Sequence, residues 1–218
     1  MALSFPLSRA AFMDLLPVQR MTFDIPETLS QTRTRGGEIL TADNGARLWQ
    51  GEITLDQITR GELAAVRPIL NLLRGAGASF LAYDISRPRP QLDPDGSGLQ
   101  GSTPAITALW ANGREISLGG LPPGYRISRD DMFAFSYGTN PTRRALHEVV
   151  TGGIANAAGN LAGIEVNPPI RPGAAIGAAV SLIKPSCKAV MVPGSYQPGT
   201  TRAFLTEGIS FKFCQTLR

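Results

Sequence analysis

Residues 165–173 read EVNPPIRPG and interrupt a strand-like run with three prolines and a closing glycine. Pro168 and Pro169 cannot donate ladder hydrogen bonds, and Pro169 restricts the residue before it to extended geometry. The sheet that leads into this stretch must therefore end there. Strand-like sequence resumes after Gly173, and these later strands need partners that the N-terminal section can offer. The stretch thus predicts a return from an inserted unit into the unit that the N-terminus began.

The inserted unit has a matching boundary in front of it. Between Ile85 and Ser102 lies SRPRPQLDPDGSGLQG, a run rich in proline, glycine and aspartate that favours neither helix nor ladder pairing. Such a connection is long for a loop within one compact domain. We therefore expect a discontinuous domain of residues 1–86 and 172–218, interrupted by an inserted β-domain of residues 87–171.

One segment has helical periodicity. It begins at Thr59 in TRGELAAVRPILNLLRGAG, and Thr59 with Glu62 matches a capping box. Pro68 removes a hydrogen bond from the helix interior, which predicts a kink or two short helices. Gly75 and Gly77 can supply a left-handed exit. The apolar residues recur at spacings of three and four that place them on one face: Leu63, Val66, Leu70 and Leu73.

Most of the remaining sequence has β-strand character. Strands are expected within residues 46–56, 78–85 and 131–138, and the last run, GISFKFCQTL, alternates apolar and polar residues. Asn112 with Gly113 is a hairpin turn signal. The predicted fold class is mainly β: an antiparallel β-sandwich or split barrel with one packed helix, plus an inserted small all-β domain. The expected inward face of the last strand is Ile209, Phe211 and Phe213.

Composition indicates a globular protein and argues against several function classes. The 218 residues are 43% hydrophobic and 17% charged, as in a chain that folds. The net charge of +4 is spread without a basic run, so DNA recognition by charge is disfavoured. No apolar stretch approaches the ~20 residues that span a bilayer. Arg9 and Asp14 interrupt the place of a signal-peptide core, and we expect synthesis in the cytoplasm.

Candidates for catalysis are few. An enzyme hypothesis rests on His147, the only histidine, with Asp130 and Asp131. Asp93 and Asp95 form a second carboxylate pair that suits calcium or ordinary turns. Without a nucleophile motif such as G-x-S-x-G, the favoured interpretation is a structural or surface histidine and turn aspartates. We expect no catalytic residue, no cofactor and no metal site.

Three further features have structural and functional interpretations. Cys187 and Cys214 are expected to be buried thiols, although a disulfide between them stays open. The glycine-rich run at 152–163 lacks the lysine and spacing of a phosphate loop and is expected to be a turn region. Several aromatic residues suit either stacking on sugars or, the favoured interpretation, the core: Trp49, Trp110, Phe133, Phe135 and Tyr137.

Several motifs in order resemble one known family. They are LLRGAGASFLAYD after the helix, ANGREI, DDMFAFSYG followed by RRALHEVV, and GIEVNPPIRPG. Together they resemble the distal tail proteins of long-tailed (siphovirus-type) bacteriophages and gene transfer agents. The likeness covers most of the chain. Where that family commonly has glycine before the central acidic residue, this chain has Arg129 before Asp130 and Asp131.

The resemblance implies a structural role without catalysis. Such proteins form a homohexameric ring at the tail tip, join the tail tube to the hub or baseplate, and line a channel through which DNA passes without specific binding. The inserted domain would be OB-like or galectin-like and would carry tail fibres or contact host-surface glycan. We expect the N-terminal arm and the loop at 86–103 to order only beside neighbours. Alternatives are a tail-tube subunit and a carbohydrate-binding tail-tip adaptor, and the sequence assigns no interface residue.

Overall fold

A computed structural model describes residues 3–218 and confirms the predicted fold class. The chain is mainly β, its named sheets are antiparallel, and these residues contain one α-helix. Two short 3₁₀ turns, Met13–Leu15 and Ser97–Leu99, accompany it.

Contacts divide the chain into two compact units. The barrel unit comprises Met1–Leu15, Ser79–Ala189 and Leu217–Arg218, and the sheet unit comprises Leu16–Ala78 and Val190–Thr216. The divisions at 78/79 and 189/190 differ from the sequence-based boundaries at 86/87 and 171/172. The assignment of residues 1–86 and 172–218 to a ring-forming domain stays a prediction.

A seven-stranded antiparallel sheet has the order β1-β4-β17-β15-β6, and β5 and β16 also pair with β17. The long strand β17 has partners along both edges, because its Ser210 pairs with Gln197 of β16 and with Thr54 of β4. Its expected inward residues, Ile209, Phe211 and Phe213, are completely buried, as predicted. The strand bounds are β1 Val18–Asp24, β4 Gln50–Leu55, β5 Ile58–Thr59, β6 Phe80–Ala82, β15 Cys187–Met191, β16 Gln197–Arg202 and β17 Leu205–Gln215.

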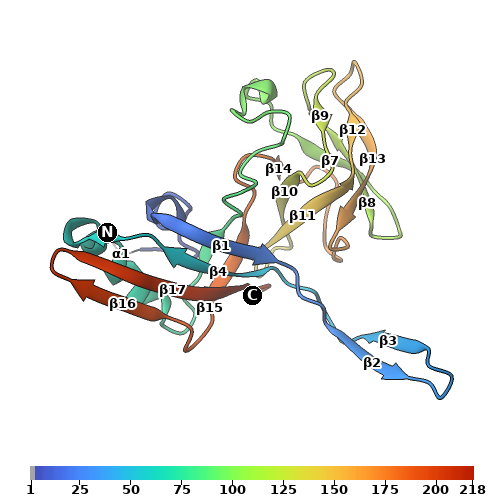
Figure 1. Cartoon of the computed structure of the whole chain (residues 1–218). Helices are drawn as coiled ribbons and strands as arrows, with labels where there is room; N and C mark the ends of the chain where they lie inside the picture. Colours follow the sequence, from blue (N-terminus) through green and yellow to red (C-terminus); the bar gives the residue numbers. More distant parts are fainter. Residues whose placement is uncertain (1–2) are drawn as a thin grey trace. The chain divides into compact units, whose positions relative to one another are not determined.

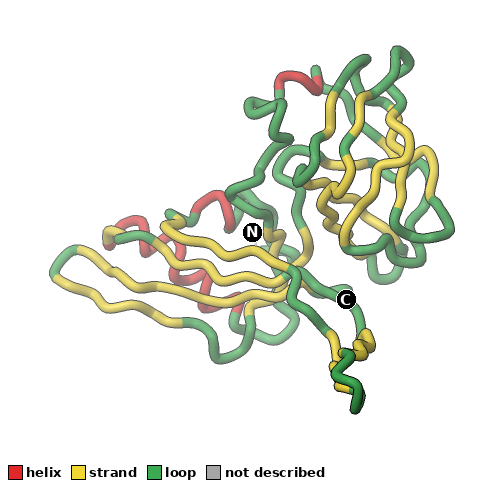
Figure 2. Tube along the Cα trace, turned by 45° about the vertical axis from the view of Figure 1, so that its right-hand side comes forward, coloured by secondary structure: helices red, strands yellow, loops and turns green. Residues whose placement is uncertain are grey.

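The helix α1 (Arg60–Leu73) packs on the strands of the sheet unit beside β5 and β17 (Figure 2). Its capping box is confirmed: the Thr59 hydroxyl accepts from the Glu62 amide, and the Glu62 carboxylate accepts from the Thr59 amide. The predicted inward residues are all buried. Gly77, but not Gly75, adopts the left-handed conformation after the helix.

Of the two effects expected of Pro68, a kink or two short helices, the second does not occur. The helix is one element from Arg60 to Leu73. Pro68 lies on the exposed side, so the carbonyl of Ala64, which a proline leaves without its helical partner, can bind water instead. The buried stripe of the helix is therefore not interrupted.

A hairpin of two strands extends beyond the ends of β1 and β4 in the sheet unit (Figure 1). Its strands, β2 (Leu29–Arg33) and β3 (Ile39–Asp43), pair only with each other. Every residue of both strands is exposed. The hairpin thus has no cover on either face among residues 3–218.

The barrel unit contains a six-stranded sheet in the order β14-β10-β11-β13-β8-β7 and a two-stranded ladder of β9 and β12. The chain just before β14 also pairs with β7, through the bridge between Ala105 and Ala179 and the hydrogen bond from the Ile106 amide to the Ala178 carbonyl. The sheet therefore closes into a barrel. Its strands are β7 Ala105–Leu109, β8 Glu115–Gly119, β9 Arg126–Ile127, β10 Met132–Tyr137, β11 Arg143–Thr151, β12 Gly153–Ile154, β13 Leu161–Asn167 and β14 Val180–Ser181.

The sheet stops where the prolines predict, because β13 ends at Asn167. The next expectation is wrong in part: the first strand after Gly173, β14, pairs with β10 and not with the N-terminal section. Val180 and Leu182 are buried in the barrel core. The physical reason is that these side chains close the barrel, so the return to the seven-stranded sheet comes later, at β15.

Candidate functional site

The residues of the enzyme hypothesis have separate partners. His147 is buried, with its Nδ1 2.7 Å from the carbonyl oxygen of Pro168 and its ring stacked on Phe133 and Phe135. A carbonyl only accepts, so Nδ1 donates. Burial lowers the pKa of His147 to about 4, although the bond to Pro168 opposes the shift. This is the geometry of a core histidine.

Asp130 and Asp131 hold a turn together. The exposed carboxylate of Asp130 lies 2.6 Å from Arg87, which also pairs with Asp84 at 2.8 Å. Burial by itself would lower the pKa of Arg87. The carboxylates of Asp84 and Asp130 together have the larger effect, so the pKa of Arg87 is raised. The buried carboxylate of Asp131 accepts from the amides of Gln91 and Ser128. Burial raises its pKa, and those two hydrogen bonds counteract the shift.

The long loop after Arg87 is held by its own chain, contrary to the expectation that it orders only beside neighbours. The carboxylate of Asp93 accepts from the Gly98 amide at 2.9 Å and from the Tyr125 hydroxyl at 3.0 Å. Leu99 is buried in the barrel core. Asp95 caps the turn at Ser97. In this loop, hydrogen bonds to carboxylates thus replace the strand-to-strand hydrogen bonds that its prolines and glycines disfavour.

The N-terminal arm is also attached from Leu7 onward. Leu7 is buried and bridges to Phe80 in parallel, and its amide donates to the Ser79 carbonyl. Further along, the carboxylate of Asp14 accepts from Tyr83 and pairs with Lys184. Met1 and Ala2, at the start of this predicted arm, lie outside the described residues.

Four of the five candidate stacking aromatics belong to the core, as favoured: Trp49, Phe133, Phe135 and Tyr137 are buried. The exception is Trp110, which is 40% exposed. It borders a hollow of about 250 Å³ that Ile170 and Arg171 also line.

Cys187 and Cys214 are thiols, with no disulfide between them, which agrees with the favoured expectation. Cys187 is buried, and Cys214 is only half-buried. Burial raises the pKa of the Cys214 thiol, so this side chain is not an activated nucleophile. No group of three or more metal-ligating side chains gathers anywhere in residues 3–218.

The β2–β3 hairpin exposes three large apolar side chains: Leu29, Ile39 and Leu40, at 48%, 53% and 54% exposure. This hairpin is not among the strands predicted from the sequence. Its signal is present, because two glycines, Gly36 and Gly37, stand between two short runs with β-strand residues. Gly37 adopts the left-handed conformation in the turn.

Two strands of the sheet unit also have a free edge. Among residues 3–218, β1 pairs only with β4, and β16 pairs only with β17. The turn between β16 and β17 presents Phe204, which is 86% exposed. Both edges carry backbone groups that can pair with another chain.

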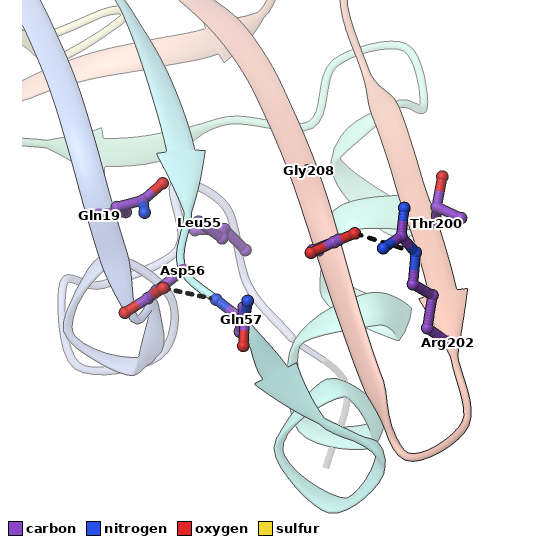
Figure 3. A pocket seen from close by; sticks show the side chains of 8 residues that line it. Gln19, Leu55, Asp56, Gln57, Thr200, Arg202 and Gly208 are labelled. Atoms are coloured by element: carbon purple, nitrogen blue, oxygen red, sulfur yellow. Dashed lines mark hydrogen bonds and ion pairs between the residues drawn. The ribbon is translucent and has the colours of Figure 1, made fainter.

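A polar hollow of about 450 Å³ lies beside the β16–β17 hairpin (Figure 3). The ion pair between Arg202 and Glu207, 3.3 Å apart, crosses the hairpin at the surface. The hollow is lined chiefly by polar side chains: Gln19, Asp56, Gln57, Thr200, Arg202 and Glu207.

Comparison with protein-family models gives no match, and comparison with curated protein sequences gives none either. The resemblance to distal tail proteins therefore remains an expectation. No helix within residues 3–218 has the length and apolar character to span a membrane.

Proposed function

We propose that this protein is a structural virion component that forms a homohexameric ring at the distal end of a phage tail tube and joins the tube to the hub or baseplate. The observation that carries the proposal is the β2–β3 hairpin, which is exposed on both faces and keeps large apolar side chains uncovered. An isolated two-stranded hairpin is marginally stable in water. A neighbouring subunit would supply the missing cover.

The free edges of the sheet unit support the same role. Identical subunits make a closed ring when one surface of each contacts a different surface of the next. The unpaired edges of β1 and β16 are two different surfaces of this kind. Strand addition between copies would satisfy their backbone groups and continue the sheet around a lumen.

The charge of the chain suits a channel for DNA. The net charge is +4 in 218 residues, without a basic run. Since each phosphate neutralised by a protein cation adds to affinity, a strongly basic lumen would retain the DNA. A weakly charged lumen lets the genome pass.

The test is assembly of the purified full chain. Negative-stain microscopy and sedimentation velocity over a concentration series should show sixfold rings for the wild type. We expect the triple variant Leu29→Ser, Ile39→Ser, Leu40→Ser to remain monomeric, because its polar hairpin no longer gains from being covered. The three residues are already exposed, so each copy should keep its fold.

The matched control is Ile176→Ser, which removes an apolar side chain that is 68% exposed in the barrel unit. This variant should form rings as the wild type does. A wild-type chain that stays monomeric at every concentration would refute the ring. Rings formed equally well by the triple variant would refute the role of the hairpin.

A further inference from the structure

A surface of the barrel unit combines exposed arginines with exposed apolar side chains. Two adjoining hollows, of about 170 and 390 Å³, share Arg129. The larger one is also lined by Arg126 of β9, Ile154 of β12 and Leu92 of the long loop. Leu92 and Ile154 are 59% and 56% exposed. We call these four residues the arginine surface.

The two arginines are available for a ligand. Neither Arg126 nor Arg129 forms an ion pair with any of residues 3–218. The Nε of Arg129 donates to the Val150 carbonyl at 2.9 Å, which positions its guanidinium group and leaves the terminal nitrogens open. A guanidinium that is held in place loses little entropy when it binds a carboxylate by two parallel hydrogen bonds.

The backbone beneath these side chains is firmly held. The Asp130 amide donates to the Val149 carbonyl, and the Asp131 carboxylate fixes both Ser128 and Gln91, the residue before Leu92. A Cβ at Gly152 would lie 2.3 Å from the Ile127 carbonyl oxygen, so only glycine permits this close approach of strands. The surface is therefore preorganised, which reduces the entropic cost of binding.

The arginine surface favours a protein segment over nucleic acid. Two further guanidiniums line the smaller hollow: Arg87 is already neutralised by Asp84, Asp130 and Glu148, and Arg89 donates to the Pro94 carbonyl at 3.0 Å. A polyanion gains affinity from many cations in series, whereas this surface offers two unpaired arginines next to two apolar side chains. Arginine beside apolar contacts is typical of protein interfaces.

We propose that the arginine surface binds an acidic segment of a partner protein, in which carboxylates pair with Arg126 and Arg129 and apolar side chains cover Leu92 and Ile154. This inference does not rest on ring formation, because its residues lie in the barrel unit. The expected partner of the barrel unit is an extended segment in which acidic and apolar residues alternate.

Fluorescence anisotropy with the full-length protein tests the proposal. The probe is a fluorescein-labelled octapeptide of alternating glutamate and leucine, with two comparison peptides that carry lysine for glutamate or serine for leucine. The wild type should bind the glutamate–leucine peptide and neither comparison peptide. Binding should weaken as sodium chloride increases, because the pairs are at the surface.

Variants separate the charge from the apolar contribution. The double variant Arg126→Glu, Arg129→Glu should bind the glutamate–leucine peptide at least about tenfold more weakly and gain affinity for the lysine peptide. Leu92→Ser with Ile154→Ser should also weaken binding. The matched control is Arg114→Glu, which changes an exposed arginine elsewhere in the same unit and should leave binding unchanged.

Several results would overturn the proposal. One is the absence of saturable binding of the glutamate–leucine peptide to the wild type up to millimolar concentration. Another is an equal loss of affinity in the Arg114→Glu control. A labelled 20-nucleotide single strand that binds the wild type more tightly than the peptide, and that the double variant loses, would make the surface a polyanion site instead.

Discussion

His147 makes the stability of the barrel unit depend on pH. The ring is neutral and buried, and its Nε2 has no hydrogen-bond partner in residues 3–218. Burial lowers its pKa from 6.5 to about 4, the bond to Pro168 opposes the shift, and the charge of Arg171 adds to it. Because the folded pKa is depressed, the unfolded chain binds the proton more readily. The contribution of neutral His147 to the unfolding free energy is therefore complete above pH 6.5 and is lost as pH falls from 6.5 toward 4.

The variant His147→Gln tests this sign, since the chain contains no other histidine. Between pH 7 and pH 4 the wild type should lose about 3 kcal/mol of unfolding free energy more than the variant does. Hydrogen exchange of peptides from β10 and β11, measured at several pH values, reports the barrel unit alone. Other titrating groups, such as Asp131, change the unfolding free energy of both proteins by the same amount, so their effects cancel in the comparison. Parallel pH profiles for the two proteins would contradict a buried neutral histidine.

At the scale of single elements, α1 carries a proline that its packing does not require. Pro68 is exposed in the middle of the helix, so Ala64 has no helical hydrogen-bond donor. Pro68→Ala restores that donor and removes the clash with the preceding turn. We expect the helix to gain about 1–3 kcal/mol of stability. Hydrogen exchange of residues 60–73 should slow accordingly.

The neighbouring exposed position supplies the control for that change. Arg67→Ala alters a side chain without changing any backbone hydrogen bond, and it should leave exchange in α1 nearly unchanged. Faster exchange in Pro68→Ala than in the wild type would mean that the proline stabilises α1 in its folded position.

Elements that depend on local pattern were predictable. The capping box at Thr59 and the alternation of Ile209, Phe211 and Phe213 need only the residues themselves, and both are as expected. Local pattern does not account for β10, where Met132 and Ala134 are buried as well as Phe133. Burial on both faces depends on what packs above and below a strand, which its own sequence does not specify.

The candidate surfaces were less predictable than the elements. The β2–β3 hairpin has a turn signal, but its exposed apolar residues become meaningful only once nothing is found to cover them. The arginine surface joins the long loop at Leu92 to strands at Arg126 and Ile154, residues far apart in sequence. Their proximity follows from the buried carboxylates of Asp93 and Asp131, whose partners no local pattern indicates.

At the scale of the whole molecule, the position of the barrel's last strand decides which piece of chain can fold alone. A fragment of residues 84–184 keeps β14 with the buried Val180 and Leu182, and it keeps the pairing that closes the barrel. A fragment of residues 84–171 lacks them, so the edges of β7 and β10 and part of the core become exposed. We expect the longer fragment to fold cooperatively and the shorter one to be largely unfolded or aggregated.

Two-dimensional ¹H–¹⁵N spectra and thermal unfolding followed by circular dichroism distinguish these outcomes. Dispersed amide signals and a sharp transition are expected for residues 84–184 alone. The variant Val180→Ser in the longer fragment should lower its midpoint, because it places a hydroxyl in the core. A change at Ile176, which is exposed in the same segment, should not. If the shorter fragment is as well folded as the longer one, residues 172–184 are not part of the barrel's folding unit, and the inserted domain ends at the prolines.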